Sequence, residues 1–247
     1  MPPPKKVPKT DAIFEQLKVV NPEADKADDT LRISIDAKAT VNIGPFSRRG
    51  RSRTGTEAAD HDFKPEATLT PFGIFLPQYD DLWLYMTRSK VTSDFIVDRL
   101  ERWWQEVRLR FLSVKTLVIN LDNGPENHSR RTQFLKRIVE FARKFDVLVQ
   151  LAYYPPYHSK YNPVERCWGI LEMHWNGSLM DSIQTVVRFA ESMTWKGRHP
   201  RVSVVETVYH KGVKLKSKEM KALESEVVRL TGLGKWFVKI PAKVRDG

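Results

Sequence analysis

A short apolar run, Thr116–Leu121 (TLVINL), leads directly into an acidic residue, Asp122. A nearly continuous apolar run of this length is typical of a strand that is buried on both faces of a sheet. The chain is therefore predicted to hold a carboxylate at the end of a buried strand. The residues at 122–124 (DNG) also form an ordinary turn sequence, because these residue types tolerate positive φ angles.

A second acidic residue is predicted at the start of a helix. Residues 153–168 read YYPPYHSKYNPVERCW and lead into an amphipathic stretch. Asn162 suits the N-cap of that helix, Pro163 its first position and Glu165 its first turn. The same residues also make an ordinary helix start with a capping box, so taken alone they favour a structural role.

Asp36 is a third acidic residue in a comparable setting. The segment Leu31–Ile43 (LRISIDAKATVNI) alternates apolar residues around Asp36 and is predicted to be a strand. A carboxylate in the middle of a strand costs free energy unless it binds a cation or accepts hydrogen bonds. Lys38 lies two residues further on the same strand face and offers such a partner without any catalytic role.

The three acidic motifs together resemble a known family. ISIDAK around Asp36, INLDNG around Asp122 and YNPVERCW around Glu165 are similar to the acidic triad of DDE transposases with a ribonuclease H-like core. In particular, the chain resembles the insertion-sequence transposases of the ISAzo type over most of its length, from about residue 14 to about residue 216. The other segments that carry the resemblance are Ile33–Gly50, Thr70–Lys90, the helix around Trp103 and Trp104, and the PPYHSKYNPVE stretch.

The resemblance implies a fold, a chemistry and a cofactor. The implied fold is α/β, with a ribonuclease H-like mixed sheet flanked by helices and a C-terminal helical extension. The implied catalytic residues are Asp36, Asp122 and Glu165, which act as ligands of Mg²⁺, with Mn²⁺ as a substitute. Hard carboxylate oxygens suit Mg²⁺, and two ions about 4 Å apart suit an in-line displacement at phosphorus. The implied reaction is metal-dependent cleavage and strand transfer of DNA.

The charge of the chain agrees with a nucleic-acid partner. Among 247 residues, 41 Lys and Arg stand against 30 Asp and Glu, which gives a formal net charge of +11. We therefore expect double-stranded DNA, both element ends and target, as the partner. Several copies of the chain could assemble on this DNA as a homo-oligomer. The predicted DNA-binding residues are Arg48, Arg49, Arg51, Arg53, Lys160 and Arg166. The four arginines at 48–53 fit a solvated loop equally well.

Two further features of composition bear on the compartment. The single cysteine, Cys167, excludes an internal disulfide and a cysteine-based zinc site, and it suits a reducing cytoplasm. No apolar run approaches the roughly 20 residues that a membrane-spanning helix needs. We therefore expect a cytoplasmic protein with no membrane partner.

Periodicity predicts the order of the remaining elements, and residues 44–69 are predicted to be a long polar loop. The predicted domains are a disordered or short-helix leader (1–24), a ribonuclease H-like DDE catalytic domain (25–180) and a C-terminal extension that packs on it (181–247). The remaining predicted elements are a helix at Asp11–Val20, a hairpin at Pro71–Gln78 and Leu82–Arg88, helices at Ser93–Leu112, Arg130–Phe145 and Asn162–Trp175, a strand at Val147–Ala152, and a C-terminal helix with packing positions Met220, Leu223, Val227 and Leu230.

Several polar residues near the motifs have two interpretations. Glu126 and Asn127 either support Asp122 or belong to a turn, and His128 and His158 either contact phosphate or lie in loops. The predictions for the other acidic residues are a solvated surface position for Glu172 and turn positions for Asp80 and Asp81.

Two other functions stay open from the sequence. Transposases of this kind carry an N-terminal helix-turn-helix region, whereas only about 30 residues precede the first predicted strand. The chain could therefore be a non-catalytic remnant that binds duplex DNA weakly and with little sequence preference. It could also be a structure-specific nuclease of the ribonuclease H-like group, which cuts DNA without joining it to a target.

Overall fold

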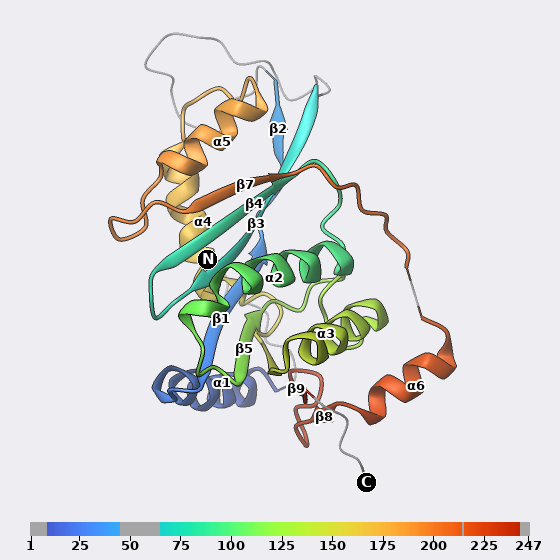
Figure 1. Ribbon diagram of the computed structural model, residues 1–247. Coiled ribbons are helices and arrows are strands. Elements are labelled where there is room, and N and C mark those ends of the chain that lie inside the picture. The colour runs from blue at the N-terminus through green and yellow to red at the C-terminus, as the bar shows by residue number, and fades with distance from the viewer. Residues whose placement is uncertain (1–8, 45–64, 214, 243–247) are drawn as a thin grey trace.

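The described residues fold into one mixed sheet with helices on both faces (Figure 1). The computed structural model describes residues 9–44, 65–213 and 215–242. The strands are β1 (Thr30–Ala37), β2 (Val41–Ile43), β3 (Ala67–Leu76), β4 (Asp81–Thr87), β5 (Thr116–Leu121), β6 (Leu148–Tyr153), β7 (Arg201–Val205), β8 (Val228–Arg229) and β9 (Phe237–Ile240). Their order across the sheet is β7-β4-β3-β1-β5-β6-β9-β8, with β2 paired to β3 beside this path.

The helices are divided between the two faces of the sheet. In Figure 1, α2 and α3 lie in front of the sheet, whereas α4 and α5 lie behind it. The helices are α1 (Thr10–Lys26), α2 (Ser93–Val107), α3 (Thr132–Phe145), α4 (Pro163–His174), α5 (Ile183–Ser192) and α6 (Ser217–Ser225), with short 3-10 turns at Arg108–Arg110 and Ser159–Tyr161. No helix in these described ranges is both long enough and apolar enough to cross a membrane.

Alternation along β1 assigns its side chains to opposite faces of the sheet. Leu31, Ile33 and Ile35 are buried in the larger core, which also contains the apolar residues of α2 and α3. Ser34 and Asp36 point to the other face, where both side chains contact α4. The central strands β1, β5 and β6 run parallel to one another, whereas β3 runs antiparallel to both of its neighbours, β1 and β4. The predicted α/β class, a mixed sheet flanked by helices, is confirmed.

The predicted strand at 31–43 is in fact two strands. β1 ends at Ala37 and β2 begins at Val41, and both pair with β3. Pro71 of β3 lies opposite the break, where its carbonyl accepts a hydrogen bond from the Lys38 N–H at 2.9 Å. Because proline has no N–H, it cannot return a hydrogen bond to the neighbouring strand, and the ladder is interrupted there.

Several predicted boundaries shift for identifiable reasons. Helix α1 runs past the expected end at Val20 and through Pro22, because buried Ala24 continues its packed face. The N-cap of α2 is Thr92, whose hydroxyl accepts the Phe95 N–H at 3.2 Å, and the helix ends at Val107, before the predicted end at Leu112. The Ser93 hydroxyl donates to the carbonyl of Glu126 at 2.7 Å. Strand β6 and helices α3 and α4 differ from the prediction by one or two residues at their ends.

The C-terminal part of the chain is less helical than predicted. Strand β7 pairs in parallel with β4, and β9 pairs antiparallel with β6, so this segment extends both edges of the sheet. Helix α6 ends at Ser225, and the prediction that Val227 and Leu230 belong to that helix is wrong. The chain turns there because Arg229 pairs with Glu224 at 2.7 Å and β8 pairs with β9. The domain boundaries at 24 and 180 stay predictions.

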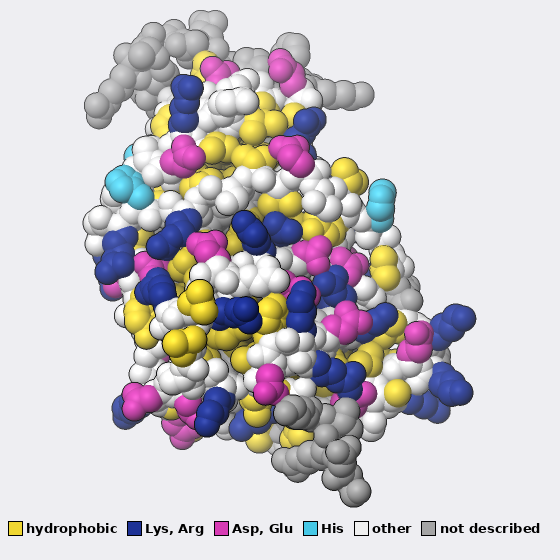
Figure 2. Space-filling view, in the orientation of Figure 1, with side chains coloured by type: hydrophobic (Ala, Val, Ile, Leu, Met, Phe, Trp, Pro, Cys, Tyr) yellow, Lys and Arg dark blue, Asp and Glu magenta, His cyan; other side chains and the backbone are white. Residues whose placement is uncertain are grey.

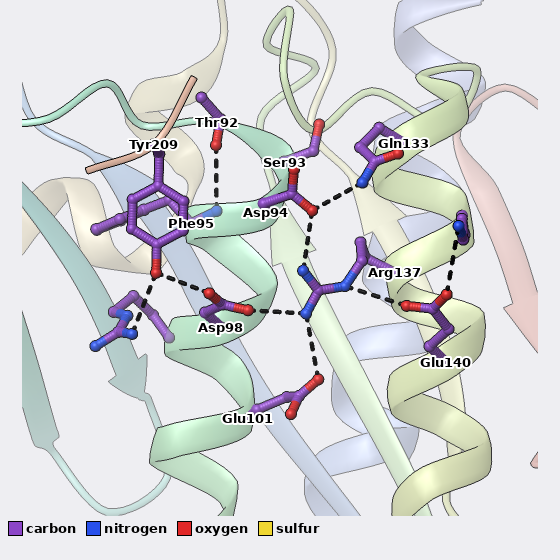
Figure 3. A network of polar contacts seen from close by, with 12 residues as sticks. Thr92, Ser93, Asp94, Phe95, Asp98, Glu101, Gln133, Arg137, Glu140 and Tyr209 are labelled. Atoms are coloured by element: carbon purple, nitrogen blue, oxygen red, sulfur yellow. Dashed lines mark hydrogen bonds and ion pairs between the residues drawn. The ribbon is translucent and has the colours of Figure 1, made fainter. Parts of the chain in front are cut away.

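A network of charged side chains joins α2 to α3 (Figure 3). Its centre is Arg137 of α3, whose guanidinium nitrogens lie 2.9 Å from Asp94 and 2.8 Å from Asp98 of α2. The hydroxyl of Tyr209 donates to Asp98 at 2.8 Å, so the segment after β7 is tied to the same network. The other members are Glu101, Gln133 and Glu140. These contacts fix the helical layer that supports β5 from the front.

Candidate active site

Asp36 lies near the end of β1, opposite Gly73 of the neighbouring strand β3. Its side chain is half-buried beneath helix α4. The indole Nε1–H of Trp168 donates a hydrogen bond to its Oδ2 atom at 3.2 Å. The carboxylate that the sequence placed in a strand therefore has a hydrogen-bond donor, and that donor comes from the helix that carries Glu165.

Gly73 makes this approach sterically feasible. A Cβ atom at this position would lie 2.8 Å from the Trp168 ring and 3.0 Å from the side chain of Val164. Real Cβ atoms do not approach other heavy atoms so closely, so only glycine lets α4 pack this tightly on β3. The missing side chain brings the Trp168 ring over the sheet beside Asp36.

Asp122 follows directly after β5, the parallel neighbour of β1. In the register of the two strands Ser34 lies opposite Asn120, and two residues further along each strand come Asp36 and Asp122. Both acidic residues therefore stand at the same end of the sheet. The side-chain amide of Asn127 donates to Asp122 Oδ1 at 2.7 Å, which confirms that Asn127 supports this carboxylate.

Glu165 lies in the first turn of α4, and Asn162 is the N-cap residue, both as predicted, but the predicted capping by side chains of the helix itself is not seen. Asn162 occupies the N-cap position without a side-chain capping bond. The hydroxyl of Ser34 accepts the Val164 N–H at 2.9 Å and donates to Asn162 Oδ1 at 2.6 Å. The Asn162 side-chain amide donates to the carbonyl of Ile35 at 3.0 Å. We refer to this fully buried arrangement of Ser34, Asn162 and Val164 as the β1–α4 clasp.

The electrostatics of Asp36 show that the three acidic residues share one region. The pKa of Asp36 is raised to about 8, first by burial and then by the charges of Asp122 and Glu165. The Trp168 hydrogen bond opposes this shift by favouring the carboxylate. Burial and two like charges disfavour a third negative charge unless a cation neutralises it.

The donor atoms suit a hard divalent cation, although the side chains do not form a closed set of ligands. Within the described ranges, no group of three or more His, Cys, Asp and Glu side chains is arranged to hold a metal ion as it stands. Convergence of Asp36, Asp122 and Glu165 to metal-binding distances therefore stays a prediction. Beside Asp122, the side-chain oxygens of Asn123 and Asn127 are buried and accept no hydrogen bond. This oxygen-only set matches the preference of Mg²⁺ and Mn²⁺.

Lys38 and Glu126, which lie near the acidic residues in sequence, form ion pairs with other residues. Lys38 forms an ion pair with Glu172 at 2.8 Å, so its interpretation as the partner of Asp36 is wrong. The same pair shows that Glu172 is not simply a solvated residue. Glu126 pairs with Arg131 at 3.2 Å and accepts from Ser93, which ties it to the loop and to α2.

The remaining candidates divide between the site and its surroundings. Lys160 and Arg166 flank Glu165 in the sequence and are exposed, and their contact with DNA stays a prediction. His158 is buried, with its Nδ1 atom 2.9 Å from the carbonyl of Pro156. The four loop arginines Arg48, Arg49, Arg51 and Arg53 lie outside the described residues.

Sequence reasoning missed four residues that shape this site: Ser34, Asn162 as a bridge to β1, Gly73 and Trp168. Gly73 carried a usable signal, because a glycine inside an apolar strand often marks a close approach of another element. The other three carried none. Their roles depend on which strand packs beneath α4, and this is a property of the tertiary fold.

The architecture and the acidic region define a transposase-type α/β domain. The structure is similar to the Mos1 transposase paired-end complex with left transposon end, with a TM-score of 0.50, 11% identity, and coverage of 76% of this chain and 55% of that chain. It is equally similar to the Mos1 mariner paired end complex with Mn, with a TM-score of 0.50, 10% identity, and coverage of 75% and 55%. At these identities the likeness shows the fold, and the predicted ribonuclease H-like fold is confirmed. The chain spans about 55% of the Mos1 chain.

The sequence comparison identifies the family. Residues 2–242 match the family described as the Rhodopirellula transposase DDE domain. The chain belongs to this family of DDE transposase domains, as the resemblance predicted. Comparison with curated protein sequences finds no significant match.

The raised pKa of Asp36 predicts how stability depends on pH without divalent ions. In the unfolded chain this carboxyl titrates near 3.8, and in the folded protein near 8. The folded state therefore binds more protons between about pH 4 and pH 8, and the free energy of unfolding falls as the pH rises through this range. Asp36→Asn should remove this part of the dependence, so the variant should gain stability over wild type as the pH rises. Urea unfolding in EDTA from pH 5 to pH 9 measures it, and parallel profiles for the two proteins would contradict the shift.

The β1–α4 clasp gives a second prediction. Ser34→Ala should leave the Val164 N–H and the Asn162 side-chain oxygen buried without a partner, which costs about 1–3 kcal/mol for each such group. Ser225→Ala is the matched control, because that exposed hydroxyl bonds only within its own helix, to Ala222 at 2.7 Å. Urea unfolding at fixed pH compares the variants. Equal stabilities of the two variants would show that the clasp does not hold α4 in place.

Proposed function

We propose that this domain cleaves DNA strands and transfers the cut ends to a target, in a reaction that depends on a divalent metal ion bound by Asp36, Asp122 and Glu165. The observation that carries the proposal is the raised pKa of Asp36, which is half-buried beneath α4 with two other carboxylates acting on it. Three carboxylates in one poorly solvated region lower the stability of the fold unless a cation binds them. Membership of a DDE transposase family supports the same assignment.

Mg²⁺ is the proposed metal, with Mn²⁺ as a substitute. The oxygen donors suit both ions, and one of the similar solved structures is described as a complex with Mn. When bound, two such ions would activate the attacking oxygen and stabilise the leaving oxygen of an in-line displacement. Asp36 would contribute to both ions, Asp122 to one and Glu165 to the other.

The residues around the carboxylates would orient them for this role. The Trp168 indole N–H donates to Oδ2 of Asp36, and the backbone N–H of Ala37 also hydrogen-bonds this carboxylate. The Asn127 amide holds Oδ1 of Asp122, and the buried Tyr153 hydroxyl donates to the Asn127 carbonyl at 2.7 Å. The β1–α4 clasp sets the position of Glu165 along β1. Such supporting contacts keep metal ligands in fixed orientations.

The proposed partner is double-stranded DNA, both element ends and target, on which a homo-oligomer could assemble. The formal net charge of +11 supports a polyanionic partner, and the similar Mos1 structure is described with a transposon end. Lys160 and Arg166, exposed beside Glu165, are the proposed contacts nearest the site. The buried thiol of Cys167 is consistent with a cytoplasmic location.

Substitution of the acidic residues tests the catalytic assignment. Asp36→Asn, Asp122→Asn and Glu165→Gln should each lower the rate of Mg²⁺-dependent strand cleavage by more than about 100-fold, because even residues that only support metal ligands typically contribute 10–100-fold. Glu191→Gln is the control, since this exposed carboxylate lies at the end of α5 and its side chain should not affect the rate. The assay uses labelled duplexes that carry an element end, with a separate target duplex.

The products distinguish the proposal from its alternatives. Cleavage followed by joining of the 3′ ends to the target supports a transposase. Cleavage without joining would indicate a structure-specific nuclease, and DNA binding without cleavage by the wild-type protein would indicate a non-catalytic remnant. Wild-type rates in any of the three acidic variants would show that the assigned residue is not a metal ligand.

A further inference from the structure

A hollow of about 740 Å³ opens beside the acidic site, on the side of the C-terminal strands. It is formed where four parts of the chain meet: the start of α1 at Lys9, the loop after β5 at Arg130, the loop before α4 at Pro156, and the turn between β8 and β9 at residues 232–236. Two of these loops also carry the site, because one begins at Asp122 and the other leads to Glu165. We call this feature the basic hollow.

The charges around the basic hollow do not balance. Its lining contains four cations, Lys9, Arg130, Arg229 and Lys235, and one carboxylate, Glu224. Arg229 is fully used inside the protein, since it pairs with Glu224 and donates to the carbonyl of Ser129 at 2.8 Å and to that of Gly234 at 2.9 Å. The Lys9 ammonium donates to the carbonyl of Gly232 at 2.5 Å, but this neutral acceptor leaves its charge in place.

Arg130 and Lys235 supply the remaining charge. Both side chains are exposed, and neither forms an ion pair with any carboxylate among the described residues. The Lys235 ammonium lies 4.9 Å from the ring centre of Trp236, which holds it at the rim. After Glu224 is matched with Arg229, three positive charges line this hollow with no carboxylate partner in the described part of the chain. Such a concave cluster attracts an anion.

The positive potential reaches the loop that follows Asp122. The pKa of His128 is lowered first by burial and then by the charges of Arg131, Lys235 and Arg130, which outweigh the opposing effect of Glu126. The loop between β5 and α3 thus carries Asp122 at its start and Arg130 near its end, so the acidic site and the basic hollow share one loop. A ligand that spans both must be an extended polyanion, because a small anion would be repelled from the carboxylates.

We infer that the basic hollow binds backbone phosphates of the DNA strand that is cut at the acidic site. This inference rests on the proposed function, because it takes DNA to be the substrate. Lys9, Arg130 and Lys235 would neutralise phosphates on one side of the cleaved position. The C-terminal strands would therefore complete the substrate-binding surface, in addition to extending the sheet.

The face covered by α2 and α3 offers a useful contrast. Figure 2 shows Lys and Arg side chains interspersed with Asp and Glu side chains across that face. Arg108 follows α2, and Lys115 precedes β5 at the end of that strand opposite to Asp122; both are exposed. They serve as matched controls, since their substitution removes one arginine and one lysine far from the basic hollow.

The test is the salt dependence of DNA binding in metal-free buffer, so that cleavage plays no part. The double variant Arg130→Gln with Lys235→Gln should reduce the slope of log affinity against log salt by about 2, one for each lost phosphate contact. The control Arg108→Gln with Lys115→Gln should leave the slope near the wild-type value. The conservative variant Arg130→Lys with Lys235→Arg should retain it, and thermal unfolding should confirm that all variants are folded.

Duplexes with neutral methylphosphonate linkages locate the contact. Neutral linkages on one side of the cleaved position should weaken binding by the wild-type protein and have little further effect on the double variant. If the wild-type protein binds and cuts DNA but the double variant and the control have equal slopes, the inference is overturned and the proposed function stands. A wild-type protein that neither binds nor cuts duplex DNA would instead overturn the proposed function.

Discussion

One hydroxyl group, that of Ser34, determines how the helix that carries Glu165 meets the strand that carries Asp36. It accepts the first free N–H of α4 and donates to Asn162, whose amide returns to the carbonyl of Ile35. Without this bridge the start of α4 would lose its hydrogen bonds to the Ser34 side chain, and the first turn, which carries Glu165, would rest more on apolar packing, which is tolerant of small displacements. Hydrogen bonds between fully buried groups are directional, and they therefore fix the helix in both position and rotation.

The same region carries a conflict between stability and function. Packing Trp168 over Gly73 shields Asp36 from water, and this burial is the largest cause of its raised pKa of about 8. The like charges of Asp122 and Glu165 add to the strain. The β1–α4 clasp, the Asn127 amide and the Trp168 indole hold the carboxylates in place against it. The arrangement is typical of a site in which stability is sacrificed so that a cation can bind.

The sequence predicted elements better than contacts. The strand Thr116–Leu121 matched the structure because a buried strand is marked by its own apolar run. The strand at 31–43 was not divided correctly, because the break depends on Pro71 in another strand. Asp36, Asp122 and Glu165 could be selected from motifs, whereas the partner of Asp36 could not. Lys38 lies close to Asp36 in sequence but pairs with Glu172, and the donor to Asp36 is the distant Trp168. Local signals identify candidate residues, and only the fold decides their neighbours.

The central claim is that the acidic region binds divalent metal, and anomalous X-ray scattering from crystals of the whole chain grown with Mn²⁺ tests it most directly. Binding should move the three carboxylates toward one another, because the cation reverses the repulsion that raises the pKa of Asp36. The account predicts one or two anomalous peaks bounded by Asp36, Asp122 and Glu165, which should be absent in Asp36→Asn crystals. Saturating Mn²⁺ with no peak between these residues, or with peaks only elsewhere on the protein, would contradict it.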